Sequence, residues 1–278
     1  MVVLVDIFKR KKLGLALSGG GAKGIAHIGV LQALKDQNLK ISYISGTSVG
    51  AIIASLFAFE VELDEIGRFA KALSISKISK FKPSRSGIFN NDNLRGLLRE
   101  LLGYSQIEDA ILPLSIIATN INSGAKVVLG SGDVCDAVCA SSAIPGIFAP
   151  VQISGIPLVD GGLVQNLPVD VLREMGANFC IGSDLSSSYR FSKVTNIVDV
   201  IRNSFGIMVY YKDYSQIESC DLLISMELGD FSLNDNIDKF EELVAIGYES
   251  TIRTLENYKE SETTLFGTVT RAVKGIFG

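Results

Sequence analysis

Ser48 is the residue of this sequence best suited to covalent chemistry, because glycines flank it at a fixed spacing. It lies in Gly46-Thr47-Ser48-Val49-Gly50, which matches the G-x-S-x-G pattern of a nucleophile elbow. The pattern predicts a strand from Ile41, a sharp turn at the serine and a helix from about Val49. Glycines permit the tight turn that exposes the hydroxyl, and the helix N-terminus favours negative charge on it. The sequence therefore predicts a nucleophile at Ser48, supported by Gly46 and Gly50.

A glycine-rich loop upstream forms a second strand–loop–helix unit. The apolar run 13–17 is followed by Ser18-Gly19-Gly20-Gly21-Ala22-Lys23-Gly24 and then by helical spacing over 25–34. Backbone N–H groups in such a loop bind an anion at a helix N-terminus. That anion could be a bound phosphate or an oxyanion that exists only during a reaction.

The phosphate alternatives fit this loop poorly. A P-loop requires G-x-x-x-x-G-K-[ST], but Lys23 precedes the last glycine and Ile25 follows it. A dinucleotide fingerprint requires an acidic residue about 20 positions further on. That region holds Tyr43 and Ile44. An oxyanion hole is the better interpretation, because a nucleophile elbow follows within a few tens of residues.

A serine nucleophile needs a base, and the single histidine is poorly placed for that role. His27 precedes Ser48, whereas an α/β-hydrolase places its histidine after the serine and the acid. A packing or helix-surface role for His27 is favoured, and a role as base stays open. A carboxylate is the favoured base. Asp160 is the candidate, because in the turn Asp160-Gly161-Gly162 backbone N–H groups could orient one oxygen and leave the other free.

Composition narrows the class of protein and of partner. Hydrophobic residues make up 47% of 278 residues and the mean hydropathy is +0.32, which suits a sheet covered on both faces. The net charge of -4, with no basic stripe, excludes a general affinity for nucleic acid. No apolar run approaches the roughly 18 residues of a membrane span. The apolar residues 2–5 precede the basic residues 9–12, the reverse of a signal peptide, so a cytoplasmic location is expected.

The four cysteines show no disulfide framework, and reduced thiols are expected. Cys135 and Cys139 would share a helix face, but a metal site would need further ligands and the chain has one histidine. Buried thiols and no metal are therefore predicted.

Alternating strands and helices predict a three-layer α/β/α fold with a mostly parallel central sheet. Strands are expected over 13–17, from Ile41 into the elbow, and over 114–119, 126–129, 151–153, 157–159, 178–184 and 221–226. Helices are expected over 25–34, 49–56, 63–73, 93–102, 133–141, 168–176, 194–214 and 238–258. The predicted division is a frayed lead-in over 1–12, a catalytic domain over 13–260 and a C-terminal amphipathic segment over 261–278.

Two segments have roles that the sequence leaves open. The basic stretch 74–86 is interpreted as a surface loop or a lid. Helical spacing gathers the apolar residues of 264–278 on one side, as in an interfacial helix. That tail could contact a membrane surface, pack on this chain, or pack on a second copy in a homo-oligomer.

Four motifs in a fixed order resemble those of a known family. They are G-G-G-x-K-G at Gly19, G-T-S-x-G at Gly46, A-S-x-x-x-P at Ala140, and D-G-G at Asp160 with N-x-P after it. This combination resembles the patatin-like phospholipase family over about residues 13–230. The resemblance implies the patatin-like fold and lipid acyl hydrolysis by a Ser48/Asp160 dyad without a metal or cofactor.

The resemblance also implies roles for the residues around the dyad. The oxyanion hole would consist of the backbone N–H groups of Gly19, Gly20, Gly21 and Ala22. The supporting residues would be Lys23, Gly24, Gly46, Gly50, Gly161 and Gly162. The family usually has arginine at the position of Lys23, and lysine keeps the charge but loses the planar fork.

The expected function is a phospholipase A or esterase that cleaves carboxylic esters through an acyl-enzyme at Ser48. Its partner would be a lipid or acyl-ester substrate, with peripheral membrane contact as an accompanying expectation. Two alternatives remain at this stage. One is a thioesterase or small-ester hydrolase, and the other is a regulatory or scaffolding protein that keeps the fold and hydrolyses little.

Overall fold

The computed structural model describes residues 4–73, 80–84, 87–186, 193–212, 214–228 and 239–277. Its centre is an eight-stranded sheet in the order β10-β9-β1-β2-β5-β8-β7, with β6 paired to β5 off this path. The parallel strands are β1 (Leu13–Leu17), β2 (Ile41–Thr47), β5 (Leu114–Asn120), β9 (Phe179–Asp184) and β10 (Leu222–Ser225). The antiparallel pairs come from β6 (Lys126–Leu129), β7 (Val151–Ile153) and β8 (Ile156–Asp160). The predicted mostly parallel α/β architecture is confirmed.

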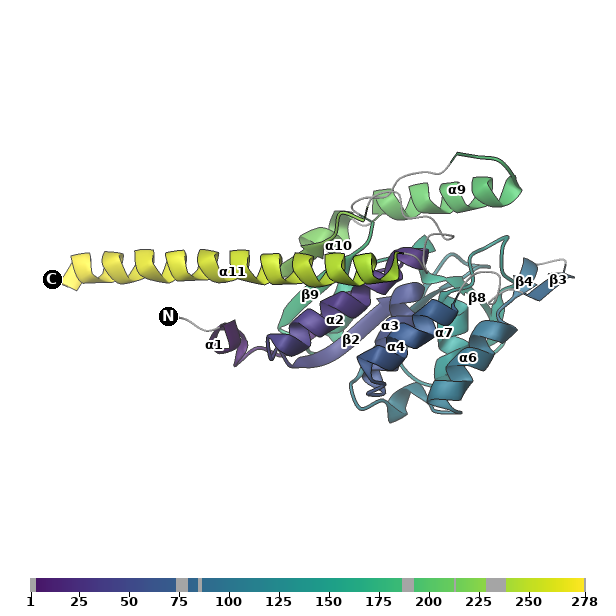
Figure 1. Cartoon of the computed structure of the whole chain (residues 1–278), viewed down its shortest axis with the longest axis horizontal. Coiled ribbons are helices and arrows are strands. Elements are labelled where there is room, and N and C mark those ends of the chain that lie inside the picture. The colour runs from purple at the N-terminus through teal and green to yellow at the C-terminus, as the bar shows by residue number, and fades with distance from the viewer. Residues whose placement is uncertain are drawn as a thin grey trace.

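Helices cover both faces of this sheet (Figure 1). The α-helices are α1 (Leu4–Phe8), α2 (Ala26–Asp36), α3 (Val49–Ala58), α4 (Leu63–Ala72), α6 (Asp92–Leu102), α7 (Val134–Ser141), α8 (Val169–Glu174), α9 (Ile197–Lys212), α10 (Tyr214–Glu218) and α11 (Phe240–Phe277). The 3-10 helices are η1 (Gly21–Ile25), η2 (Ile107–Asp109) and η3 (Gly161–Leu163).

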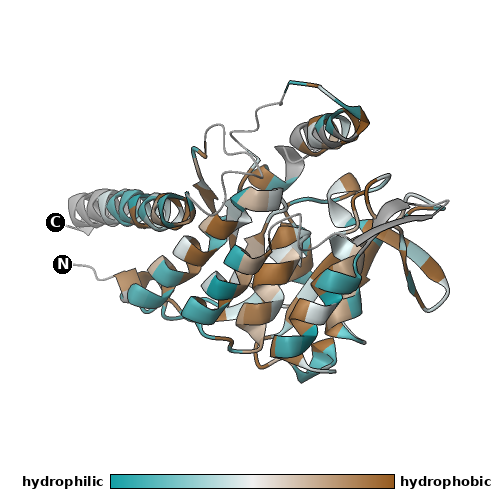
Figure 2. Ribbon diagram, turned by 45° about the vertical axis from the view of Figure 1, so that its right-hand side comes forward, coloured by the Kyte–Doolittle hydropathy of each residue, from teal (hydrophilic) through white to brown (hydrophobic). Residues whose placement is uncertain are grey.

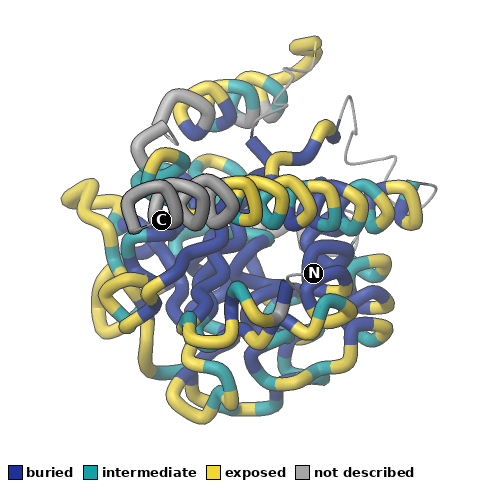
Figure 3. Tube along the Cα trace, turned by 90° about the vertical axis from the view of Figure 1, so that its left-hand side faces the viewer, coloured by how far each residue is buried: buried dark blue, intermediate teal, exposed yellow. Residues whose placement is uncertain are grey.

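Strand β1 shows how the two faces divide the core. Leu15 and Leu17 belong to the larger cluster, which includes residues of α2, α3, α6 and α7, whereas Ala16 belongs to a smaller cluster beneath α8. Successive side chains of a strand point to opposite faces, so one buried strand contributes to both clusters. Figure 3 shows that buried residues concentrate in the strands and on the inner sides of the helices.

Residues 4–12 are not the frayed lead-in that the sequence suggested. Helix α1 places Phe8 in the core at 4% exposure, with ring centroids 5.2 Å from Phe179 and 5.6 Å from Tyr258. Lys11 Nζ donates a hydrogen bond to the Tyr258 hydroxyl at 3.1 Å. The expectation was wrong because five helical residues show no periodicity, and their burial depends on partners distant in sequence.

Helix α11 is longer than the predicted helix over 238–258. It is one continuous helix of 38 residues, and its C-terminal half extends beyond the rest of the molecule in Figure 1. Its N-terminal part crosses α2 closely, because an added Cβ at Gly29 would lie 1.9 Å from the Val244 carbonyl oxygen. The side chains of residues 265–278 lie outside the described part of the chain, so the amphipathic face expected there stays a prediction.

The basic stretch 74–86 also lies partly outside the described residues. Its described part, β3 (Lys80–Ser84), pairs antiparallel with β4 (Gly87–Asn90), so residues 80–84 form a strand and not the expected loop. Within the described ranges, no helix is both long and apolar enough to cross a membrane.

Candidate active site

Ser48 occupies a strained turn between β2 and α3. Its backbone has φ 54° and ψ −123°, a conformation that residues with a side chain rarely adopt, and it caps the N-terminus of α3. The residue is partly exposed although its strand and helix are largely buried. The turn therefore holds the serine at the protein surface in the way that the elbow motif predicts.

The flanking glycines are required by close backbone approaches. A Cβ on Gly46 would lie 2.5 Å from the Gly50 carbonyl oxygen. A Cβ on Gly50 would lie 2.1 Å from the carbonyl oxygen of Leu17, in β1. Any side chain at either position would push the helix away from the strands that support it.

Ser141 fixes the elbow from a third element. The backbone N–H of Ser48 donates to Ser141 Oγ at 2.9 Å, and the Ser141 hydroxyl donates to the Ile117 carbonyl at 2.6 Å. Ser141 thus ties the turn to β5 from the end of α7. In the sequence, Ser141 is only the serine of the A-S-x-x-x-P motif, which gave it no role; that motif is the signal that could have pointed to this contact.

The register of β5 brings Ser48 and Asp160 together. β2 pairs with residues 114–117 of β5, and its last residue Thr47 is opposite Ile117. β8 pairs with residues 118–120, and its last residue Asp160 is opposite Ala118. Because β6 occupies the other edge over 116–119, β2 and β8 must share one edge and meet end to end. The residues that end these two strands are therefore neighbours.

The Asp160 carboxylate is fully buried, and its surroundings hold it in place. Oδ1 accepts a hydrogen bond from the Gly162 N–H at 2.8 Å, and the Asp160 carbonyl accepts one from Thr119 Oγ1 at 2.8 Å. A Cβ on Gly161 would lie 2.3 Å from the Ile117 carbonyl oxygen, so this turn also needs glycine.

Burial controls the acidity of this carboxylate. It raises the pKa of Asp160 to about 7, and hydrogen bonding to the Gly162 N–H and the Ser48 hydroxyl offsets part of the effect. Among the described residues, no hydrogen bond of ordinary length and angle reaches the second carboxylate oxygen, Oδ2. The side chain therefore combines a fixed oxygen, a second oxygen with unused capacity and a pKa close to neutrality.

The glycine loop packs directly against the elbow. A Cβ on Gly19 would lie 3.2 Å from the Ser48 Cβ, and one on Gly24 would lie 2.1 Å from Val49 Cγ2. Gly20 precedes η1, and Gly21 has a positive φ of 58°. The first N–H groups of a helix have no intrahelical acceptor. The N–H groups of Gly21 and Ala22, at the start of η1, can therefore donate hydrogen bonds to another group. Lys23 is buried at 9% exposure.

His27 lies in the core and not at the site. Its Nε2 is 2.9 Å from the Ser18 carbonyl, which can only accept, so Nε2 carries the proton and Nδ1 accepts from the Ser183 hydroxyl at 2.9 Å. Burial lowers the pKa of His27 to about 4, which keeps the ring neutral. With both nitrogens engaged, this side chain links the start of the glycine loop to β9 and has no nitrogen left to activate Ser48.

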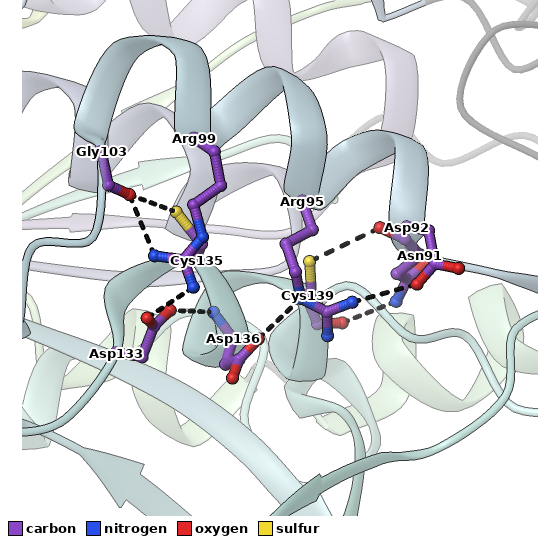
Figure 4. A network of polar contacts seen from close by, with 9 residues as sticks. All are labelled: Asn91, Asp92, Arg95, Arg99, Gly103, Asp133, Cys135, Asp136 and Cys139. Atoms are coloured by element: carbon purple, nitrogen blue, oxygen red, sulfur yellow. Dashed lines mark hydrogen bonds and ion pairs between the residues drawn. The ribbon is translucent and has the colours of Figure 1, made fainter.

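A polar network between α6 and α7 holds the helix that ends at Ser141 (Figure 4). Arg95 bonds to Asp136 and Arg99 to Asp133, each at 2.6 Å. The Cys135 and Cys139 thiols face the carbonyls of Gly103 and Asn91 at 3.9 and 3.8 Å. These short ion pairs fix α7 relative to α6, and thereby fix the position of its last residue.

The cysteines behave largely as the sequence suggested. Cys135, Cys139 and Cys180 are buried free thiols, whereas Cys220 is partly exposed. Burial raises the pKa of the Cys139 thiol to about 12, which makes it a poor nucleophile and metal ligand. Within the described ranges, no three His, Cys, Asp or Glu residues are grouped to hold a metal ion.

Comparisons with known proteins agree with this architecture. Residues 15–173 match the model of a family described as patatin-like phospholipase. An uncharacterized NTE family protein of Mycobacterium tuberculosis is 34% identical over 180 residues, which cover 64% of this chain and 50% of that protein. Lysophospholipase NTE1 of Yarrowia lipolytica is 34% identical over 191 residues, which cover 66% of this chain and 13% of that protein. The chain thus spans half or less of these relatives.

The fold is also found in a solved structure. VipD from Legionella pneumophila superposes with a TM-score of 0.57 at 17% sequence identity, covering 89% of this chain and 67% of that one. At this identity the likeness concerns the fold alone.

Proposed function

Because the chain belongs to the patatin-like phospholipase family, we propose that it is a lipid acyl hydrolase of the phospholipase A or esterase type. In this proposal Ser48 is the nucleophile and Asp160 is its base. The observation that carries it is the meeting of β2 and β8 on one edge of β5, which brings a strained, partly exposed serine to a buried carboxylate. The family match and the relative named a lysophospholipase support lipid hydrolysis.

The reaction would proceed in two halves. Asp160 accepts the Ser48 proton while the serine oxygen attacks the ester carbonyl, and the tetrahedral intermediate collapses as the alcohol leaves with that proton. Asp160 then removes a proton from water, the hydroxide attacks the acyl-enzyme, and the fatty acid leaves as the proton returns to Ser48. A pKa of about 7 suits a group that must accept and return a proton near neutral pH.

The oxyanion would be stabilised by the glycine loop. The N–H groups of Gly20, Gly21 and Ala22 are the donors that we assign, at the start of η1 beside the elbow. The Gly19 N–H donates to the Asn166 carbonyl at 3.3 Å, so we assign Gly19 to close packing on Ser48. The N-terminus of α3 adds a favourable dipole at the serine oxygen.

Hydrolysis is favoured over a purely regulatory role because the site contains two features that lower the stability of the folded protein. A residue with a side chain at positive φ costs on the order of 1–3 kcal/mol, and burial of a carboxylate opposes its ionisation. A scaffold that needs only the surface of this fold has no use for these features.

The test is to label the purified chain with a fluorophosphonate probe and to map the modified residue by peptide mass spectrometry. Ser48→Ala removes the proposed nucleophile, Asp160→Asn removes the base with little change in shape, and Ser123→Ala is a control on an exposed loop serine. His27→Ala tests the alternative base. Rates are then measured on phosphatidylcholine, a lysophospholipid, an acyl thioester and p-nitrophenyl butyrate.

We expect labelling at Ser48 alone and a loss of at least about a thousandfold in rate for Ser48→Ala and Asp160→Asn. His27→Ala should keep most of its activity per folded molecule and lose thermal stability, because its ring is buried and hydrogen-bonded. A folded wild-type protein that takes up no label would favour the regulatory alternative. Preference for the thioester over all phospholipids would favour a thioesterase.

A further inference from the structure

We propose that one face of α9 docks the protein onto a lipid surface, with the active site beneath the helix. The docking face consists of Ile197, Val200, Ile207 and Met208 of α9, together with Val194, which lies three residues before the helix. This inference rests on the proposed function, because it assumes that the substrate is a lipid in a membrane or micelle. It concerns a surface outside the dyad and outside the C-terminal tail.

One side of α9 lies over the turn that holds Asp160. A Cβ on Gly162 would lie 3.0 Å from Phe205 Cζ and 3.3 Å from Val209 Cγ2. The N–H of the same glycine binds the Asp160 carboxylate. Val209 is buried at 5% exposure. Further along the helix, a Cβ on Gly146 would lie 3.1 Å from Ile201 Cδ1. Helix α9 therefore covers the catalytic turn with apolar side chains.

Local sequence defines the start of this helix. Asn196 Oδ1 accepts a hydrogen bond from the Asp199 N–H at 3.1 Å. Asp199 Oδ2 accepts hydrogen bonds from the Thr195 N–H at 3.0 Å and from the Thr195 hydroxyl at 2.6 Å. These hydrogen bonds cap the first turn of α9 and stabilise it, and they engage the Asp199 carboxylate. The helix can therefore hold a defined outer face although it lies at the periphery of the fold (Figure 1).

The outer face is unusually apolar for a surface. Half of the large hydrophobic side chains exposed in the described part of the chain lie within 194–208. Their exposed fractions are 52% for Val194, 66% for Ile197, 42% for Val200, 44% for Ile207 and 38% for Met208. Figure 2 shows α9 apart from the helices that cover the sheet, with hydrophobic segments in brown. An exposed apolar cluster of this kind marks an interaction site.

Helical periodicity places the exposed residues on one side. At 100° per residue, Ile197, Val200, Ile207 and Met208 fall within about 100° of one another. Ile201, Phe205 and Val209 form the adjacent stripe, in which Phe205 and Val209 face the catalytic turn at Gly162 and Ile201 faces Gly146. The exposed apolar side chains therefore lie beside the stripe that packs toward Asp160, and Ser204 is an exposed polar residue on the same arc.

A lipid surface fits this face better than a second copy of the chain. A stable protein interface needs about 20–30 residues a side, and five partly exposed side chains fall far short of that. An interfacial helix needs only a narrow apolar stripe at the level of the head groups. Lys193, exposed next to Val194, supplies a positive charge that suits phosphate groups. The proposed substrate would then be drawn from the surface to which the helix binds.

The experiment separates docking from chemistry. Binding is measured by flotation of the Ser48→Ala protein with vesicles of phosphatidylcholine and phosphatidylethanolamine, so that no hydrolysis disturbs the vesicles. The test variant adds Ile197→Gln and Ile207→Gln, and a second variant adds Val200→Gln and Met208→Gln. The matched control adds Ile111→Gln and Val128→Gln, which remove two exposed hydrophobics on other parts of the fold. Each pair is also made with Ser48 intact and assayed on vesicles and on p-nitrophenyl butyrate.

We expect both α9 variants to lose vesicle binding and vesicle hydrolysis by about tenfold or more, and the control to keep both. Hydrolysis of the soluble ester should change by less than about twofold, because these outer side chains are not assigned to the reaction. Unchanged flotation of both α9 variants would overturn the proposal, as would a concentration-dependent dimer that the substitutions abolish. Vesicle binding through α9 without hydrolysis of any ester would sustain docking and refute the proposed function.

Discussion

At the scale of single residues, the site concentrates features that oppose folding. Ser48 adopts a left-handed backbone conformation, and Asp160 keeps a carboxylate away from water. Each is held by neighbours that leave it little freedom, namely Ser141 for the serine and Gly162 for the aspartate. Such local strain persists only where the surrounding structure enforces it, and it is typical of catalytic groups.

The pKa of Asp160 predicts the pH dependence of the reaction. In the proposed mechanism Asp160 must be ionised to accept the Ser48 proton, so kcat/KM should rise about tenfold per pH unit below pH 7 and level off above it. The measurement is a pH profile of kcat/KM for a soluble ester. A profile that is flat down to pH 5 would mean that Asp160 is ionised there and is not the titrating base.

The ionisation of Asp160 also lowers the stability of the folded protein as the pH rises. Because the pKa of Asp160 is raised from 3.8 to about 7 on folding, the folded state binds more protons between these values, and this group makes stability fall as pH rises through that window. Asp160→Asn removes the effect. Its stability relative to wild type should therefore increase by about 2 kcal/mol between pH 5.5 and pH 8.5, measured by urea unfolding. An equal difference at both pH values would contradict the raised pKa.

At the scale of elements, β5 is the platform on which the site is assembled. Its first half pairs with β2 and its second half with β8, while the Ile117 carbonyl between them receives the Ser141 hydroxyl. Helix α7 delivers Ser141 to that point, and its ion pairs to α6 keep it there. Three elements therefore converge on two adjacent residues of one strand.

Ser141 should act as a positioning residue. Ser141→Ala removes the acceptor of the Ser48 N–H, so we expect kcat to fall about tenfold with little change in KM, since about 1–1.5 kcal/mol of alignment is lost. Ser141→Thr keeps the hydroxyl and should restore most of the rate. The matched control is Ser142→Ala, because the buried Ser142 hydroxyl has no hydrogen-bond partner among the described residues. Equal effects of Ser141→Ala and Ser142→Ala would contradict this role.

At the scale of the whole molecule, distant parts of the chain close the fold. Helix α11 packs on α2 at Gly29, and α1 packs where α11 approaches β9. The first and last helices of the described chain, α1 and α11, therefore both contribute to the cluster around Phe8, Phe179 and Tyr258. Lys11 lies 4.0 Å from the Phe179 ring centroid and adds a cation–π contact there.

This cluster should contribute measurably to stability. Phe8→Ala removes a buried ring, and we expect the free energy of unfolding to fall by about 3 kcal/mol in urea denaturation. The control is Lys9→Ala, because Lys9 is the next residue and is exposed. It should change the free energy of unfolding by less than about 0.5 kcal/mol. Amides of α11 near Tyr258 should exchange faster in Phe8→Ala. No loss of stability would mean that α1 is not an integral part of the fold.

The sequence by itself determined what depends on neighbours along the chain. The glycine spacing around Ser48 predicted the turn, because only residues without Cβ allow the backbone contacts made by Gly46 and Gly50. Short apolar runs, typical of buried strands, alternate with segments of helical spacing, and this alternation predicted most strands and helices to within a few residues. The order of four short motifs also indicated the family that the comparison with known proteins identifies.

The tertiary structure alone decided what depends on residues far apart in the chain. The meeting of β2 with β8, the pKa of Asp160, the contact of Ser141 with the elbow and the burial of His27 all arise from pairings across many residues. The folding of α1 onto Tyr258 and the covering of Gly162 by α9 are of the same kind. Local patterns cannot specify them, because the apolar burial and hydrogen bonding that stabilise these contacts exist only once the sheet has formed.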